Sequence, residues 1–76
     1  MINELDEIVL ISDLPKVGLV AGDIGTVVMI YGENKGYEVE FMTLDGDTIA
    51  VETLYPHQIR AIKGNEVAHA RELVLA

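Results

Sequence analysis

Two glycines three positions apart lead directly into a β-branched run, Gly22-Asp23-Ile24-Gly25-Thr26-Val27-Val28. Glycine adopts backbone conformations that other residues avoid, so a Gly-x-x-Gly-x-Val segment suits a tight bend that feeds a strand. The pattern predicts a small, strongly bent β-barrel and indicates no particular chemistry. We expect structural roles in turns for Gly18, Gly22, Gly25, Gly36 and Gly46.

Short apolar or alternating runs separated by turn signals make up most of the chain. Residues 32–36 and 44–47 have the composition of hairpin turns, and 54–57 suit a short 3₁₀ turn. Five short strands at this spacing favour an all-β, partly open barrel over residues 1–63. The expected strands are residues 7–12, buried on both faces or nearly so, and 24–31, 37–43, 48–53 and 58–62.

The loop at residues 13–19 combines strand-breaking and apolar residues. Pro15 and Gly18 stop regular pairing there. We therefore expect the loop to be held on the barrel core by its apolar side chains, Leu14, Val17 and Leu19.

Residues 64–76 form a tail after the last expected strand. Asn65 is a suitable N-cap for a short helix over 66–75. A ten-residue helix is marginal in isolation, so it must dock on its own barrel, dock on a partner, or fray. A second copy as that partner would make a homodimer. Val67, Ala70 and Val74 would share one face of this helix, with Leu73 beside it.

The charge balance restricts the classes of partner. The 76 residues include thirteen acidic and five basic side chains, for a net charge of −8. This charge opposes binding to nucleic acid or to an anionic membrane and permits a basic protein partner. The absence of cysteine excludes disulfides and thiolate zinc sites and favours a reducing compartment, and no signal peptide is evident. We expect a cytoplasmic protein.

Catalysis is not expected, because a nucleophile needs an adjacent base and a group that orients that base. The only serine is Ser12, and the two histidines, His57 and His69, lie on different expected elements. We therefore predict that the protein is not an enzyme and holds no cofactor.

The expected third strand alternates, with Tyr37, Val39 and Phe41 on one face and Glu38 and Glu40 on the other, so that one face is wet. Neither these glutamates nor the acids of the following turn have the spacing of a calcium loop, and no metal is expected.

We predict an acidic protein-interaction module whose partner is another protein. Its carboxylate face would comprise Glu38, Glu40 and Glu52, supported by the loop at 14–23 and by the tail. An alternative is an aromatic groove for proline-rich peptides, formed by Tyr31, Tyr37 and Tyr55 with Pro56. The candidate partner-binding residues are Glu38, Glu40, Glu52, Tyr55, Val67, Leu73 and Val74.

The first expected strand, the following loop and Gly22-x-x-Gly25-x-Val27 resemble the KOW-type SH3-like barrel of ribosomal proteins and transcription elongation factors, over roughly residues 7–31. That resemblance implies an SH3-like barrel and, as an alternative function, nucleic-acid binding. Those proteins often carry a basic residue before the first glycine, where this chain has Ala21. The departure puts phosphate contact in doubt.

A second resemblance spans most of the chain. Residues 14–15, 18–19, 22–28, 37–41 and 45–51 look like a family of small uncharacterised bacterial proteins. That family is similar in plan to accessory SH3-like barrels of electron-transport complexes, such as the small subunit of ferredoxin–thioredoxin reductase and the photosystem I stromal subunit. The resemblance implies two further alternatives: an accessory subunit of a redox complex, and an antitoxin or immunity-type protein that neutralises a basic partner.

Overall fold

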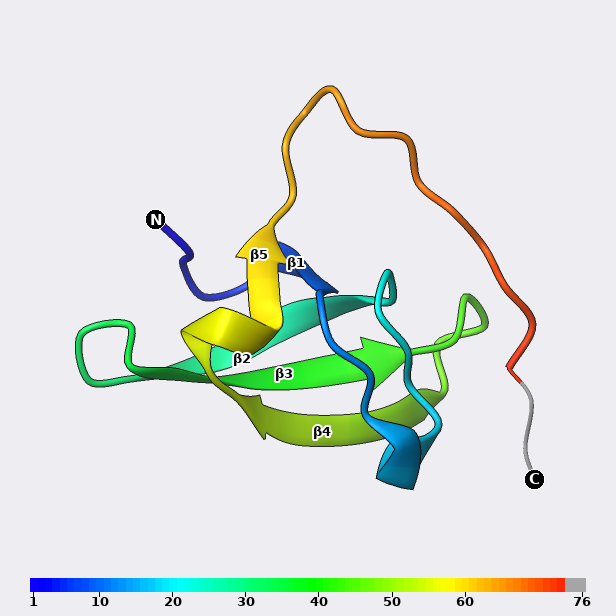
Figure 1. The fold of residues 1–76 in the computed structure, drawn as a ribbon, viewed down its shortest axis with the longest axis horizontal. Helices are drawn as coiled ribbons and strands as arrows, with labels where there is room; N and C mark the ends of the chain where they lie inside the picture. The colour runs from blue at the N-terminus through cyan, green and yellow to red at the C-terminus, as the bar shows by residue number, and fades with distance from the viewer. Residues whose placement is uncertain (74–76) are drawn as a thin grey trace.

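The structure is a computed structural model that describes residues 1–73, and its fold is all-β (Figure 1). Each of the five strands given below begins and ends within two residues of the bounds expected from the sequence. No helix among the described residues is long and apolar enough to cross a membrane. The elements are β1 (Glu7–Leu10), η1 (Pro15–Val17), β2 (Ile24–Tyr31), β3 (Gly36–Met42), β4 (Thr48–Leu54), η2 (Pro56–Gln58) and β5 (Ile59–Ala61), where η marks a 3₁₀ turn.

The five strands form one antiparallel sheet in the order β4-β3-β2-β1-β5. The first strand pairs with both β2 and β5, since Ile8 lies opposite Gly25 on one side and Ala61 on the other. Register shifts after Val27 and after Phe41 mark irregularities of the β-bulge type, which increase twist and bend the strands. The expected all-β, partly open, barrel-like fold is confirmed.

The core lies on the inner side of this bent sheet. Along β1, Ile8 and Leu10 are buried whereas Glu7 is exposed, so the expectation of a strand buried on both faces is wrong. In the loop after β1, Leu19 is fully buried and Leu14 and Val17 pack against the core, as expected. The buried core residues are Ile8, Leu10, Leu19, Val27, Tyr37, Val39, Phe41, Leu54 and Ile59.

The glycines divide into two groups. Gly18, Gly22 and Gly46 have positive φ and lie in turns, as expected. Gly25 and Gly36 lie instead within β2 and β3, so their assignment to turns is wrong. Gly25 serves close packing, because it faces the buried side chains of β3 without room for a Cβ.

The tail is extended where a helix was predicted, so that prediction is wrong for residues 66–73; residues 74 and 75 lie outside the described part. From β5 the tail arches away from the sheet and descends on the side of the β3–β4 turn (Figure 1). A short helix is marginal without a packing surface, and Val67 is 95% exposed. Ion pairs of Glu66 and Arg71 hold the extended chain instead.

Candidate functional site

The strand register brings three glutamates to the outer side of the sheet, opposite the core. Residues that pair directly across antiparallel strands share one side of the sheet. Glu40 pairs with Thr26, and Thr26 also pairs with Glu7. Glu38 precedes Glu40 by two residues on β3, so its side chain lies on the same side of the sheet. We call Glu7, Glu38 and Glu40 the acidic face. Sequence reasoning missed Glu7, because only the pairing of β1 with β2 shows which side it shares.

Glu52 does not belong to this face. It pairs with Val39, whose side chain is in the core, so Glu52 projects from the opposite side to Glu38 and Glu40. The hypothesis that Glu38, Glu40 and Glu52 form one face is therefore wrong. Its error is one of register, since a shift of one residue moves a side chain to the other side of the sheet.

Threonines of β4 fix the two central carboxylates. The Thr48 hydroxyl donates to Glu40 Oε2 at 2.7 Å, and the Thr53 hydroxyl donates to Glu38 Oε1. An ionised carboxylate accepts several hydrogen bonds, so both glutamates retain capacity for donors from a partner. The arrangement suits recognition of positive charge.

A groove of about 830 Å³ lies between the edge of the acidic face and the tail. Its walls include Glu7 and Glu40, the loop before β2, the β3–β4 turn, and tail residues 68–71 with Leu73. A smaller hollow of about 230 Å³ lies under the preceding part of the tail and shares Glu7 and Ile24 with the groove. The tail therefore arches over open space. We call the larger of the two hollows, the groove of about 830 Å³, the tail groove.

The first anchor of the tail joins Arg60 of β5 to Glu66. The Arg60 guanidinium donates twice, at 2.8 Å to Oε2 and 2.7 Å to Oε1 of Glu66, and the Lys63 N–H donates to Oε2 at 2.7 Å. The hydrogen bond from Arg60 and then that from Lys63 lower the pKa of Glu66 to about 2.

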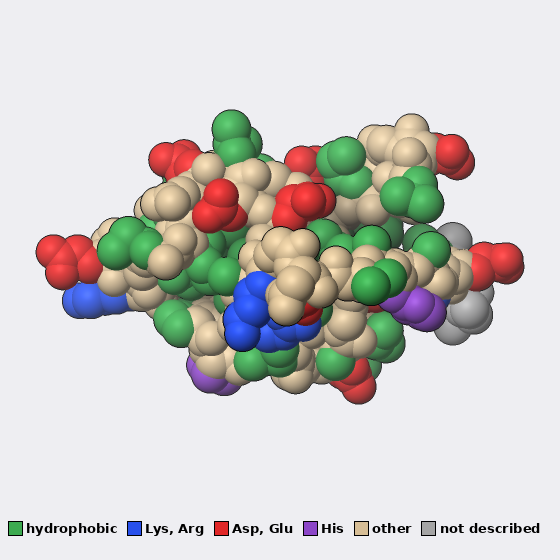
Figure 2. Space-filling view, turned by 90° about the horizontal axis from the view of Figure 1, so that it is seen from above, with side chains coloured by type: hydrophobic (Ala, Val, Ile, Leu, Met, Phe, Trp, Pro, Cys, Tyr) green, Lys and Arg blue, Asp and Glu red, His purple; other side chains and the backbone are tan. Residues whose placement is uncertain are grey.

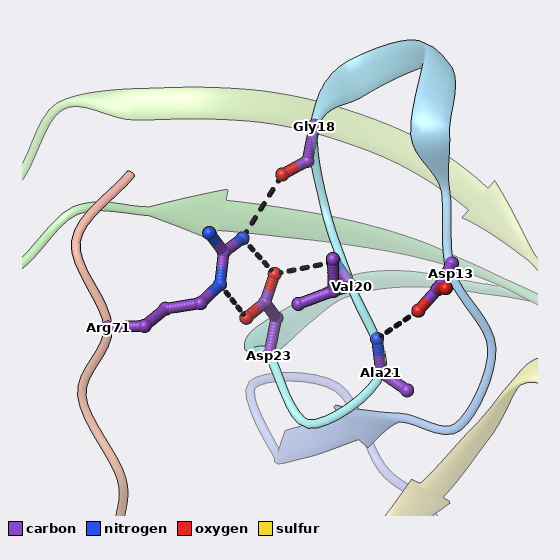
Figure 3. Close-up of polar contacts among 6 residues, drawn as sticks. All are labelled: Asp13, Gly18, Val20, Ala21, Asp23 and Arg71. Atoms are coloured by element: carbon purple, nitrogen blue, oxygen red, sulfur yellow. Dashed lines mark hydrogen bonds and ion pairs between the residues drawn. The ribbon is translucent and has the colours of Figure 1, made fainter. Parts of the chain in front are cut away.

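The second anchor joins the tail to the loop before β2 (Figure 3). Arg71 Nε donates to Asp23 Oδ1 at 2.8 Å, and Nη2 donates to Oδ2 at 2.6 Å and to the Gly18 carbonyl at 3.1 Å. The Val20 N–H also donates to Oδ2, at 2.9 Å. Partial burial acts to raise the pKa of Asp23, but the Arg71 and Val20 hydrogen bonds and the Arg71 charge outweigh it and lower the pKa.

Acid is expected to release the tail. Both anchoring carboxyls have a lowered pKa in the folded protein, so their contribution is complete above the ordinary carboxyl pKa and is lost as the pH falls. For Glu66 the loss runs from about pH 4.5 to about pH 2. We expect the ¹⁵N relaxation of residues 66–71 to show increasing mobility over this range while the β3 amides stay rigid. A tail equally ordered at both ends of the range would contradict this prediction.

The other predicted site residues are dispersed. Tyr37 is in the core, whereas Tyr31 and Tyr55 are half-exposed beside Gly36, at the end of β3 away from the tail groove. The three tyrosines therefore do not form the aromatic groove considered as an alternative. Tyr55 stacks on His57, with ring centroids 6.2 Å apart.

The structure places the predicted partner-binding residues of the tail differently. Leu73 lines the tail groove, whereas Val67 lines only the smaller hollow and projects into solvent. Val74 lies outside the described residues. The Ser12 hydroxyl is buried without a hydrogen-bond partner among residues 1–73 and so pairs with no described histidine. In that part of the chain no three His, Asp or Glu side chains are grouped as a metal site.

The comparison with known proteins gives a family without an assigned activity. Neither a curated protein nor a solved structure matches the chain significantly. One family model matches residues 4–61, which span every strand from β1 to β5. The chain belongs to the family described as Domain of unknown function (DUF4926).

Proposed function

We propose that the protein is a non-catalytic interaction module whose acidic face binds a basic partner protein. The observation that carries this proposal is the convergence of Glu7 and Glu40 on the wall of the tail groove, with Glu38 beside them. The charge distribution of the visible face is consistent with this proposal. Figure 2 shows acidic side chains spread over that face, whereas basic side chains gather in two places. Complementary charge would speed encounter with a basic partner and fix its orientation.

Apolar side chains beside the carboxylates would add contact area. Met29 pairs with Glu38, and Val51 pairs with Glu40, so both share the side of the acidic face. Each is about half exposed, at 50% and 48%. Protein interfaces combine such apolar contacts with a polar rim, and methionine is enriched in them.

We further infer that the barrel is SH3-like and that the protein acts in the cytoplasm. The strand order, the long loop before β2 and the 3₁₀ turn before β5 support the first inference. The absence of cysteine supports the second. Nucleic acid is not the proposed partner, because the net charge is −8 and both arginines are engaged in ion pairs. An antitoxin or immunity role would be one form of this proposal, with a basic toxin as partner.

Matched charge variants test the proposal on a partner that has been captured by cross-linking, identified and purified. Glu7→Gln/Glu40→Gln and Glu4→Gln/Glu33→Gln remove the same charge, but the second pair lies outside the acidic face. We expect the first pair to raise the Kd at least tenfold, and the second less than twofold, by calorimetry at physiological salt. Equal effects of the two pairs would overturn the proposal, because only net charge would then matter. So would a captured partner with an acidic binding surface.

A further inference from the structure

We propose that Asp23 and the Gly18 carbonyl form a binding site for an arginine side chain, which Arg71 of the tail occupies until an arginine of a basic partner replaces it. The inference rests on the proposed function for the identity of the partner, but the site itself stands on its own geometry. It adds a defined recognition element to the edge of the tail groove and gives the tail a role as an internal competitor.

In the structure the site holds the Arg71 guanidinium, which donates hydrogen bonds to both carboxylate oxygens of Asp23 and to the Gly18 carbonyl (Figure 3). Nε and Nη2 of Arg71 donate to the two carboxylate oxygens of Asp23 at 2.8 and 2.6 Å, and Nη2 also donates to the Gly18 carbonyl at 3.1 Å. This fork-to-fork geometry is selective for arginine, since a lysine ammonium is a point charge and cannot make the paired contacts.

The acceptors are held in place independently of Arg71. The Val20 N–H donates to Asp23 Oδ2 at 2.9 Å, and the Asp13 carboxylate accepts from the Ala21 N–H at 2.8 Å across the same loop. With Arg71 bound, the Asp23 side chain is 15% exposed. A carboxylate fixed in this way keeps its orientation when the tail leaves, so an incoming arginine meets a formed site.

The tail is suited to displacement. It has no regular secondary structure over residues 66–73, and it spans the tail groove instead of packing on the sheet. A short tethered ligand competes at an effective concentration of roughly millimolar, so a single free arginine competes poorly. A partner that also contacts the nearby acidic face binds at several points and can displace the tail.

An NMR titration tests the site with a defined probe: an acetylated and amidated alanine pentapeptide with a central arginine. The peptide is added to the ¹⁵N-labelled full chain and to its Arg71→Ala variant, and the Val20 amide is followed because its N–H donates to Asp23. We expect the variant to bind with a Kd at least fivefold lower than that of the unmodified chain. We also expect a peptide with central lysine to bind the variant at least fivefold more weakly than the arginine peptide.

Equal affinity of the variant and the unmodified chain would overturn the proposal, as would equal affinity for the two peptides. Adding Asp23→Asn to the variant should abolish binding, and retained binding with a native amide spectrum would also overturn it. If that double variant does not fold, the comparison of the two peptides decides alone. Peptide binding by the Arg71→Ala variant requires no partner protein, so failure of the acidic face to bind a partner and failure of this site are distinguishable.

Discussion

Replacing Phe41 with alanine is expected to remove a large part of the free energy of unfolding. The Phe41 side chain is 1% exposed and is the largest of the fully buried side chains. Removing a buried phenylalanine typically costs about 3–5 kcal/mol through lost burial and the cavity that remains. A domain of this size has a free energy of unfolding of only about 4–11 kcal/mol, so the change removes a large part of it.

Met42 provides the matched control. It follows Phe41 on β3 and is 49% exposed. Met42→Ala should lower the free energy of unfolding by less than about 1 kcal/mol, as for surface positions generally. Urea unfolding followed by circular dichroism measures both variants. Similar losses for the two variants would contradict the assignment of Phe41 to the core and Met42 to the surface.

Gly25→Ala is expected to have the next largest effect. A Cβ at Gly25 would lie 2.6 Å from Val39 Cγ1 and 2.8 Å from Phe41 Cε1. Both of these side chains are fully buried, so neither can move aside without disturbing the packing around it. Overpacking of this kind costs about 1–3 kcal/mol or more, which for so small a domain lowers the Tm by roughly 10 °C.

Gly64→Ala is the control for this substitution, because a Cβ at Gly64 would meet no atom within 4 Å. Its φ lies outside the left-handed region, so alanine should be neutral there or slightly stabilising. Thermal unfolding should therefore separate the two variants by several degrees. An unchanged Tm for Gly25→Ala would show that β2 and β3 do not approach as closely as described.

Local signals were sufficient to predict the strands. The Gly-x-x-Gly-x-Val segment and the alternation of Tyr37, Val39 and Phe41 each depend on residues near one another in the sequence, and β2 and β3 follow them closely. A structural role for Gly25 was also predictable, but its assignment to a turn was wrong. Its physical reason, the approach of Phe41, required the tertiary structure.

The site depended on information that the sequence does not carry locally. The register between β3 and β4 puts Glu52 opposite Val39, and that register is set by the turn and by the irregularity after Phe41. Glu7 joins the acidic face only through pairing with β2. The tail was predicted to be helical from its apolar spacing, but its conformation follows from ion pairs with Arg60 and Asp23, which precede it in the chain.

The most direct test of the proposed function is the position of the bound partner. Hydrogen–deuterium exchange of the full chain, alone and in complex with the purified partner, measures it. We predict slowed exchange in β3 around Glu38 and Glu40 and in residues 24–26. Protection confined to the far end of the sheet, around Tyr31 and Tyr55, with residues 24–26 and Glu40 unchanged, would contradict the assignment of the acidic face as the binding site.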